Sequence, residues 1–421
     1  MEKVVAVLGG GGHVGLPFCL VLANSGYQVY GIDIDEKINK TVMTGKYPYE
    51  EEHGEEYLRR VMDKQTLTMT SDLAKIKESD IVTITLGTPV DENLNPRITL
   101  LTQIIIDNKS YFKKDQLIIL RSTVFPGATE LIKRLLEEST GLIVGQDIFL
   151  AYAPERVLQG KAIEEIRHLP QIIGVFEDKS YKIAEKFFSY FLEDVCFKLT
   201  PVEAEIGKLI TNMARYVEFA VANEFYLIAD SFGANIHKII SACNYHYPRL
   251  NLPRPGPNVG GPCLYKDGWF LLERFPFNEI ISAAFQINEG MPMQIVSKLE
   301  RLPQIKKVSI LGMTYKAGID DTRNSLSFKL KKQLERNNYE IVLVDPYLEN
   351  TSDMSEIKAS DAVVLMTPHK EFGDFKSILN MVDNDECIYV DIWGFWEKMK
   401  YKSRNGYFFG KEAKHEYLSM R

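Results

Sequence analysis

The stretch KVVAVLGGGGHVGLPFCLVLANSGYQVYGIDI, residues 3–34, decides the fold. Its first apolar run predicts a buried strand, the glycines predict a turn, and the apolar stretch after them predicts a helix. The turn contains Gly10-x-Gly12-x-x-Gly15, and Asp33 stands at the end of the next predicted strand. Glycines allow a tight turn and close approach to a pyrophosphate, and the carboxylate can accept ribose hydroxyls. The stretch therefore predicts dinucleotide binding.

The same residues favour NAD over NADP, because the Asp33 carboxylate would repel a 2′-phosphate. A second interpretation stays open at this point. Four consecutive glycines, residues 9–12, could also form a flexible loop that binds nothing. The order of strand, glycine turn, helix and acid favours the dinucleotide site.

The rest of the first half alternates strand and helix signals. Apolar runs at 80–87, 116–124, 147–155 and 170–176 read as buried strands, and amphipathic stretches at 55–64, 129–138 and 179–191 read as helices. This alternation predicts a parallel sheet that is covered by helices on both faces.

The pattern changes at Pro201, which suits the first position of a helix after Thr200 as N-cap. Apolar residues then recur every three or four positions, which predicts one helix of about 30 residues, about 45 Å long, that suits a connector or a dimer interface. Residues 249–262 are rich in proline and glycine and predict a loop, and a helix is expected near 283–299.

Strand signals return at 306–312, 340–346, 361–367 and 387–394 with helical stretches between them. The predicted fold class is α/β, with two Rossmann-like, doubly wound parallel-sheet domains joined by a central helical domain with a long connecting helix. The expected domains are 1–198, 199–302 and 303–421.

Composition narrows the class of protein. The 421 residues are 45% hydrophobic and 25% charged, and 50 basic against 57 acidic residues give a net charge of −7. Nucleic acid and anionic membrane are therefore not expected as partners. The five cysteines form no CxxC and the histidines no HExxH, so we expect no metal site, no disulfide framework and a cytoplasmic location. The uncharged stretch 4–32 is interrupted by glycines, which argues against a membrane span.

Several residues could carry chemistry, and each also has a structural interpretation. Lys208 and Asn212 are four apart on the long helix, where such a pair is usually a solvated face. Cys263 follows two glycines and a proline and precedes Lys266, a setting that could expose a thiolate, although a lone cysteine is often an inert buried thiol. Both interpretations of Cys263 stay open.

Two other charged motifs follow predicted strands, where open α/β sheets bind ligands. Glu155 lies in APERV, and its alternative is a surface ion pair with Arg156. Lys316 and Arg323 lie in TYKAGIDDTRNS, where two cations suit a diphosphate and a solvated charged turn is the alternative.

Together these motifs resemble the nucleotide-sugar 6-dehydrogenases, a family that includes UDP-glucose, GDP-mannose and UDP-N-acetylhexosamine dehydrogenases. The resemblance covers nearly the whole chain, in order: GGGGHVGLP, LGTP, RSTVFPGAT, APERV, the Lys208–Asn212 pair, GGPCLYKD and the DDTRNS segment. It implies an NAD domain, a central dimerisation domain and a C-terminal domain that binds the UDP-sugar.

The resemblance also implies residue roles. The expected NAD contacts are Gly10, Gly12, His13, Val14, Gly15, Asp33, Thr88, Pro89, Ser122, Thr123 and Lys266. The expected substrate contacts are Arg156, Val157, Leu158, Lys208, Asn212, Arg249, Asn258, Gly260, Tyr315, Lys316 and Arg323. The expected catalytic set is Cys263, Lys208, Asn212, Asp267, Glu155 and Thr123. Arg249 corresponds to an arginine that the family can offer across a homodimer to the neighbouring site.

The chemistry of the family accounts for this set. A primary alcohol is oxidised to an aldehyde, and Cys263 then adds to the aldehyde so that a second hydride can be lost. The resulting thioester must be hydrolysed, with Glu155 and Thr123 expected to help the water. Lys208 and Asn212 are expected to stabilise the oxyanions. One sugar would therefore use two NAD.

Sequence details favour one branch of the family. APERV, YPRLN and PGPNVGGPC resemble the UDP-N-acetylhexosamine enzymes, so UDP-N-acetylmannosamine or UDP-N-acetylglucosamine is the expected substrate and the uronic acid, a precursor for polysaccharides, the expected product. Arg121 replaces the Glu or Lys that many members carry, with an effect that the sequence leaves open. The alternatives are a UDP-glucose 6-dehydrogenase, a single-oxidation β-hydroxyacid dehydrogenase and a non-catalytic nucleotide-sugar-binding protein.

Overall fold

A computed structural model describes residues 3–91, 97–272, 277–302 and 304–396; the rest of the predicted C-terminal domain lies outside these residues. The chain divides into two compact units, residues 1–211 with 266–275 and residues 212–265 with 276–421. The division falls inside two helices, α9 (Pro201–Ser231) and α11 (Gly261–Leu272). The domain boundaries expected from the sequence stay predictions.

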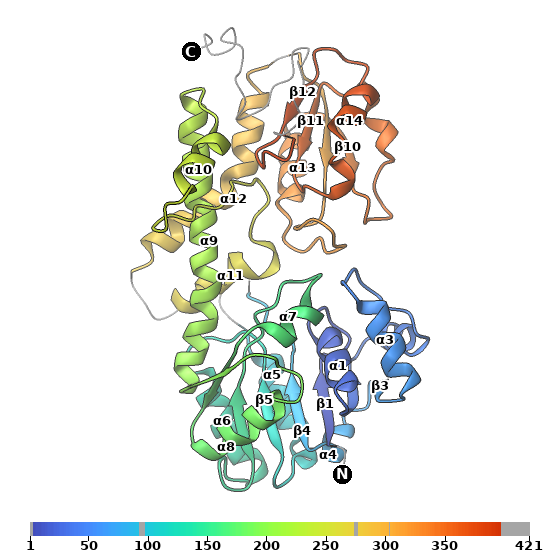
Figure 1. The fold of residues 1–421 in the computed structure, drawn as a ribbon, viewed down its shortest axis with the longest axis vertical. Helices are drawn as coiled ribbons and strands as arrows, with labels where there is room; N and C mark the ends of the chain where they lie inside the picture. The colour runs from blue at the N-terminus through green and yellow to red at the C-terminus, as the bar shows by residue number, and fades with distance from the viewer. Residues whose placement is uncertain (1–2, 92–96, 273–276, 303, 397–421) are drawn as a thin grey trace. The chain divides into compact units, whose positions relative to one another are not determined.

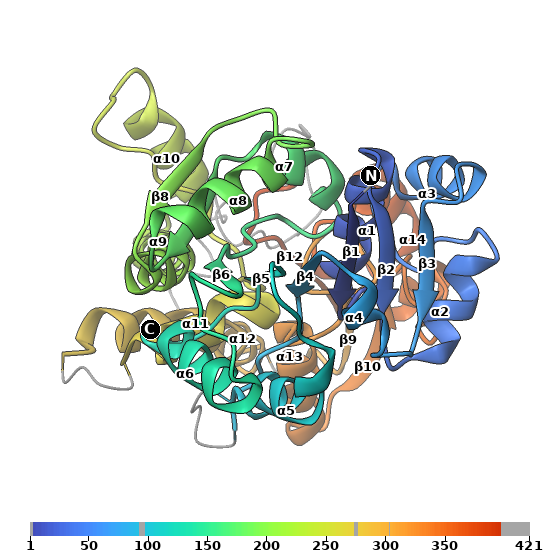
Figure 2. The same cartoon turned by 90° about the horizontal axis from the view of Figure 1, so that it is seen from below.

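The first unit contains an eight-stranded sheet in the order β3-β2-β1-β4-β5-β6-β7-β8, which Figure 2 shows from below. The order reverses between β1 and β4, which is the switch point where doubly wound sheets bind ligands. The strands are β1 (Val4–Leu8), β2 (Gln28–Ile32), β3 (Leu67–Thr70), β4 (Ile81–Ile84), β5 (Leu117–Leu120), β6 (Phe149–Tyr152), β7 (Gln171–Val175) and β8 (Cys196–Leu199).

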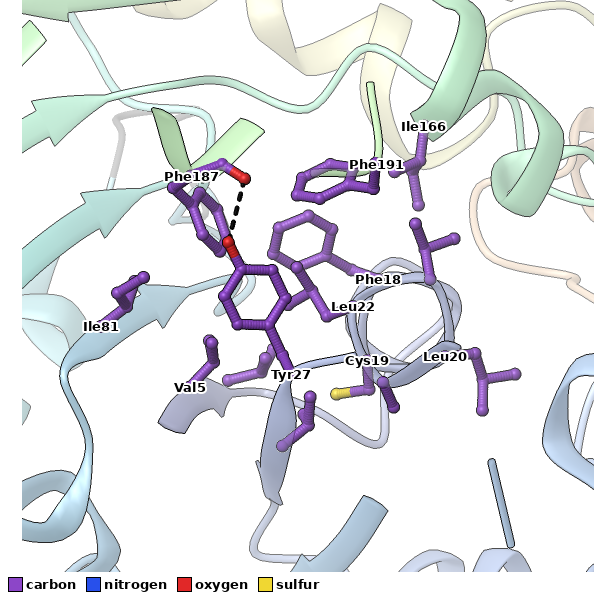
Figure 3. Close-up of a cluster of buried hydrophobic side chains, with 14 of the residues drawn as sticks. Val5, Phe18, Cys19, Leu20, Leu22, Tyr27, Ile81, Ile166, Phe187 and Phe191 are labelled. Atoms are coloured by element: carbon purple, nitrogen blue, oxygen red, sulfur yellow. Dashed lines mark hydrogen bonds between the residues drawn. The ribbon is translucent and has the colours of Figure 1, made fainter. Parts of the chain in front are cut away.

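Helices cover both faces of this sheet, as expected for near-continuous apolar strands. One face is covered by α1 (Gly15–Asn24), α2 (Glu36–Met43), α3 (Gly54–Asp63), α7 (Ala162–His168) and α8 (Asp178–Phe188). The other is covered by α4 (Lys75–Glu78), α5 (Thr99–Asp107) and α6 (Ala128–Thr140). On the first face, Phe18 of α1 packs edge-on against Phe187 and Phe191, with ring centroids 6.3 and 5.9 Å away (Figure 3).

The second unit contains a four-stranded parallel sheet in the order β10-β9-β11-β12, with its own switch point between β9 and β11. Its strands are β9 (Lys307–Leu311), β10 (Glu340–Val344), β11 (Ala362–Leu365) and β12 (Ile388–Val390). The helices α10 (Ile236–Asn244), α12 (Glu279–Leu299) and α13 (Leu326–Arg336) pack on one face, and α14 (Phe375–Met381) packs on the other (Figure 1).

This architecture confirms the predicted fold class of two Rossmann-like sheets with a long central helix. The helix expected from Pro201 is α9, which has 31 residues. No helix in the described ranges is long and apolar enough to span a bilayer.

Three details of the fold differ from the sequence-based expectation. The short strands β3 and β8 were not predicted, because LTMT is only four residues long and CFKL has no fully buried side chain. The first sheet is not wholly parallel, since β6 and β7 pair antiparallel. The predicted loop 249–262 ends early, because α11 begins at Gly261, so Cys263 lies in the first turn of a helix rather than in a loop.

Candidate functional site

The glycine turn after β1 is built for close approach of a ligand. Gly9 adopts a φ of +80°, and its N–H and that of Gly10 both donate to Ile32 O at the end of β2. A Cβ on Gly15 would lie 2.0 Å from Gly9 O, so the first turn of α1 can pack on this turn only with glycine there. Val14 is the N-cap of α1. Free backbone N–H groups at a helix start favour a pyrophosphate.

Asp33 holds the same turn from the neighbouring strand end. Its Oδ2 accepts the Gly11 N–H at 2.9 Å, and its Oδ1 accepts the Asp35 N–H at 3.0 Å. The next side chain, Ile34, is 94% exposed. A partly buried carboxylate at the end of β2 fits the ribose hydroxyls of NAD, so these residues suit the dinucleotide that the sequence predicts.

Tyr49 and Gln159 also lie beside the glycine turn, although the sequence did not assign them to the site. The ring of His13 contacts that of Tyr49 at a tilt of 38°, with the ring centroids 3.9 Å apart, and Gln159 Nε2 lies 3.0 Å from His13 Nδ1. The Tyr49 hydroxyl donates to Gly11 O at 2.6 Å. A tyrosine in a connecting loop carries no spacing signal, so only the folded chain places it beside the glycines.

Hydrogen bonds join the loop that follows β4 to the loop that follows β5, beside the switch point of the sheet. Thr88 Oγ1 donates to Thr123 O at 2.5 Å, and Ser122 Oγ donates to Leu86 O at 2.6 Å. Thr88 and Ser122 are buried, Thr123 is half-buried and Pro89 is exposed. The structure therefore brings these four predicted NAD contacts to the two strand ends beside the glycine turn.

The buried carboxylate of Glu205 on α9 joins the start of α6 to the helix that also carries Lys208. Glu205 accepts hydrogen bonds from Gly127 N at 2.6 Å, Thr129 N at 2.7 Å and Thr129 Oγ1 at 2.5 Å. Burial raises the pKa of Glu205, and these hydrogen bonds oppose the rise. Glu205 was not predicted, although an acid among the apolar positions of a helix is a usable signal.

Glu155 and its neighbours follow β6. Its carboxylate contacts the Arg121 guanidinium, and not the Arg156 side chain that the sequence offered as an alternative. The Arg156 guanidinium donates to Pro170 O, and burial lowers the pKa of Arg156. Val157 and Leu158 are half-buried, and Leu158 N donates to the Glu165 carboxylate at 2.6 Å.

Three further predicted residues of the first unit, Lys208, Lys266 and Asp267, lie on α9 and α11, the two helices in which the boundary between the units falls. Lys208 is 7% exposed, and Lys266 Nζ contacts Asp267 Oδ1 at 3.1 Å. Asp267 is fully buried, while Lys266 also lies over the Phe270 ring. The Lys208 side chain is therefore not the solvated face that its spacing allowed.

In the second unit, Cys263 lies in the first turn of α11 and its side chain is exposed. A helix start is a place where backbone N–H dipoles favour a thiolate. Gly260 and Gly261 precede it with φ values of +118° and +54°. A Cβ on Gly261 would lie 2.4 Å from the Tyr315 ring, so glycine lets that ring pack against the start of the helix.

Tyr315 and Arg323, two predicted substrate contacts, lie within electrostatic reach of Cys263. Burial raises the pKa of the Tyr315 phenol, and the charge of Cys263 adds to the rise. Arg323 forms a two-pronged contact with Asp321, through Nε at 3.0 Å and Nη2 at 2.6 Å. The Asp321 hydrogen bond is the main cause that raises the pKa of Arg323, and Cys263 contributes.

The loop with Tyr315 and Lys316 is anchored to the ends of β10 and β11 by a buried pair. His369 Nδ1 accepts the Gly318 N–H at 3.1 Å, and His369 Nε2 lies 3.2 Å from Asp345 Oδ2. Thr314 Oγ1 donates to Lys316 O at 3.0 Å. The loop that carries two predicted substrate contacts thus follows β9, at the switch point of the smaller sheet.

Three further predicted substrate contacts belong to this unit. Asn212 is buried, and Asn258 is 3% exposed with its amide bonded to backbone and hydroxyl groups of the unit. Arg249 is exposed and packs over the Tyr247 ring, 4.4 Å from its centroid. Among the described residues, no group of three or more His, Cys, Asp or Glu could hold a metal ion.

Comparison with known proteins gives three matches to one family, in the order of the chain. The NAD binding domain of the UDP-glucose/GDP-mannose dehydrogenase family matches residues 3–192, its central domain matches 202–290, and its UDP binding domain matches 309–398.

Individual relatives match over most of the chain. The UDP-N-acetyl-D-mannosamine dehydrogenase of Pyrococcus horikoshii is 35% identical over 378 residues, 87% of this chain and 90% of the relative. That of Methanocaldococcus jannaschii is 31% identical over 95% of both chains. A solved structure of UDP-N-acetyl-mannosamine dehydrogenase from Staphylococcus aureus has a TM-score of 0.87 at 28% identity, and covers 97% of this chain and 98% of its own.

Proposed function

This chain belongs to the UDP-glucose/GDP-mannose dehydrogenase family of NAD-dependent oxidoreductases, and from that membership we propose that it oxidises the C6 alcohol of a UDP-N-acetylhexosamine to the uronic acid. UDP-N-acetylmannosamine is the preferred substrate, because the relatives that match over most of the chain carry that name. UDP-N-acetylglucosamine and UDP-glucose are the competing sugars.

The exposed thiol of Cys263 is the observation that carries this function. Cys19 and Cys387 are buried, and burial raises the pKa of the Cys387 thiol to about 12. Cys263, in contrast, lies exposed at a helix start with Tyr315 and Arg323 in electrostatic reach. A nucleophilic thiol beside a cationic, phenol-lined loop supports covalent catalysis on a bound nucleotide sugar.

Each of the predicted site residues has its own role in the proposed reaction. The Gly10–Gly15 turn and Asp33 would hold NAD, which would supply the acceptor for one hydride in each oxidation, so that two NAD are used per sugar. Lys208 and Asn212 donate to the oxygen on C6 and stabilise negative charge that develops there. The thiolate of Cys263 adds to the aldehyde carbon, and the hemiacetal so formed becomes a thioester in the second oxidation.

Hydrolysis then releases the acid. A water oxygen bonds to the thioester carbon, the carbon–sulfur bond breaks, and Cys263 leaves as a thiolate. Glu155 accepts a proton from the water, while Thr123 and Asp267 orient the polar groups around it. The chemistry needs a reduced thiol, which fits the cytoplasm.

The proposed enzyme is a homodimer, with Arg249 reaching the neighbouring site. Its support is a set of exposed apolar side chains on α9 and α10 and directly after them, since Phe225, Ile228, Phe232, Ile239 and Tyr245 are between 42% and 82% exposed. Exposed apolar side chains that form a patch mark association surfaces.

A panel of sugar nucleotides tests the substrate. We expect NADH formation with the highest kcat/KM for UDP-N-acetylmannosamine. A higher kcat/KM for UDP-glucose than for both N-acetylated sugars would contradict the assignment. A β-hydroxyacid dehydrogenase would reduce NAD with a small hydroxy acid, and a non-catalytic binding protein would form no NADH with any of them.

A further inference from the structure

We propose that Arg121 is a positioning residue that holds Glu155 for hydrolysis of the Cys263 thioester, an inference that rests on the proposed function. Arg121 follows β5 and Glu155 follows β6, two neighbouring parallel strands in which Leu120 lies opposite Tyr152. The Glu155 N–H donates to Arg121 O at 3.3 Å, so the two residues are joined through both backbone and side chain.

The surroundings of Arg121 restrict its guanidinium to a few contacts. Its side chain is 2% exposed, against 12% for Glu155. The guanidinium lies over the ring of Phe18, which Figure 3 shows, at 4.4 Å from its centroid, and over the ring of Phe188 at 5.5 Å. Because a buried cation needs a counter-charge, the Glu155 carboxylate is directed toward Arg121.

Gln171 holds the Arg121 guanidinium in the orientation that contacts Glu155. Arg121 Nη1 donates to Gln171 Oε1 at 3.3 Å while Nη2 donates to Glu155. Gln171 in turn donates to Ile172 O at 2.8 Å and to Pro154 O at 3.3 Å. A planar guanidinium can hold both partners and stack on both rings, which the single ammonium of lysine cannot do.

These contacts leave Glu155 with one orientation and little unused hydrogen-bonding capacity. Its Oε1 accepts the N–H groups of Arg156 at 2.8 Å and Val157 at 3.3 Å, and its Oε2 faces Arg121. An ionised carboxylate offers about four acceptor directions, and three of them are taken. The remaining direction is the one available to a water molecule.

Arg121 acts through Glu155, so its loss should slow only the step in which Glu155 takes part. That step comes after both oxidations. Slowing a step that follows an irreversible one lowers kcat and leaves kcat/KM for the sugar nearly unchanged. General damage to the fold would instead lower both quantities.

The test compares Arg121→Met, which removes the charge at similar length, with Arg121→Lys and Glu155→Gln. We expect Arg121→Met to lower kcat about 10- to 100-fold at nearly constant kcat/KM. Intact-protein mass spectrometry after mixing with UDP-N-acetylmannosamine and NAD should show a sugar-nucleotide adduct on Cys263. Arg121→Lys keeps the charge but cannot contact Glu155 and Gln171 at the same time. It should therefore accumulate less adduct than Arg121→Met.

Controls separate this inference from the proposed function. Arg167→Met removes another arginine–glutamate pair, with Glu193, on the surface of the same unit and should behave like the unchanged enzyme. If Glu155→Gln forms an adduct but Arg121→Met and Arg121→Lys form none and lose kcat and kcat/KM equally, the inference about Arg121 is wrong. If Glu155→Gln itself forms neither adduct nor NADH burst, the proposed role of Glu155 fails first.

Discussion

The side-chain oxygen of Asn258 accepts the Leu326 N–H at 2.8 Å, which joins the loop before Cys263 to the start of α13. The amide nitrogen of Asn258 lies 2.9 Å from both Thr314 O and Thr367 Oγ1. All polar atoms of this buried side chain therefore have partners within the protein. Its position explains how the loop before Cys263 and the loop after β9 are held together.

We expect Asn258→Ala to destabilise the second unit. The change leaves the Leu326 N–H without its partner in a buried place, at a cost of about 2 kcal/mol, while the Thr314 carbonyl still accepts a hydrogen bond from Thr367 Oγ1. Urea unfolding measures this loss, with the exposed Asn337→Ala as a control that should change little. An Asn258→Ala protein of unchanged stability, with only a raised KM for the UDP-sugar, would show that Asn258 serves the substrate instead.

Asp33 should determine the preference for NAD over NADP. Its carboxylate accepts the Gly11 N–H, and in the proposed NAD site a 2′-phosphate would bring further negative charge beside it. We expect kcat/KM to be at least about 100-fold higher with NAD, since a like-charge contact costs several kcal/mol. Asp33→Ser should narrow that ratio, whereas comparable values for the two cofactors in the unchanged enzyme would refute this role.

The Asp345–His369 pair predicts a pH-dependent stability. Burial alone would raise the pKa of Asp345, but hydrogen bonds from His369, Tyr347 N and Met313 N hold it below its ordinary value of 3.8. A lowered pKa stabilises the fold above the ordinary value, and this stabilisation is lost as the pH falls through the folded pKa.

Asp345→Asn should therefore lower the free energy of unfolding by about 2 kcal/mol at neutral pH, and the difference should shrink below about pH 4. Chemical unfolding at pH 7, 5 and 3.5 measures it. Asp383→Asn, which removes an exposed pair with Lys358, is the control. A difference between Asp345→Asn and the unchanged protein that stays constant over this range would exclude the lowered pKa as its cause.

Subunit mixing tests the proposed sharing of sites. Arg249→Ala and Cys263→Ala proteins should each form no uronic acid, but an equimolar mixture, in which about half of the dimers are mixed, should recover up to about a quarter of the activity. Recovery is expected because one of the two sites in a mixed dimer would hold an intact Arg249 and an intact Cys263. Verified mixed dimers without any recovery would place Arg249 in its own subunit's site or outside both.

Local patterns were sufficient for some of these features. The glycine turn and Asp33 lie within one strand–helix–strand segment, where spacing alone predicts that both belong to one dinucleotide site. The helix from Pro201 was also predicted, because its apolar spacing continues without a break.

Contacts between distant segments could not be predicted. Arg121 and Glu155 are separated by a whole helix and strand, and only the parallel pairing of β5 and β6 brings them together. The partners of Asn258 come from the loops after β9 and β11 and from the start of α13. The edge strand β8 was missed because its side chains are only partly buried, so the apolar pattern that marks a strand is weak.

Counting NADH against limiting UDP-N-acetylmannosamine, with the sugar products identified by mass, tests the central claim of two oxidations through Cys263. The unchanged enzyme should form two NADH per sugar and release only the uronic acid. Cys263→Ala should form no acid and at most one NADH per sugar, because the aldehyde has no thiol to accept it. A Cys263→Ala enzyme that still makes the acid with two NADH per sugar would contradict the account.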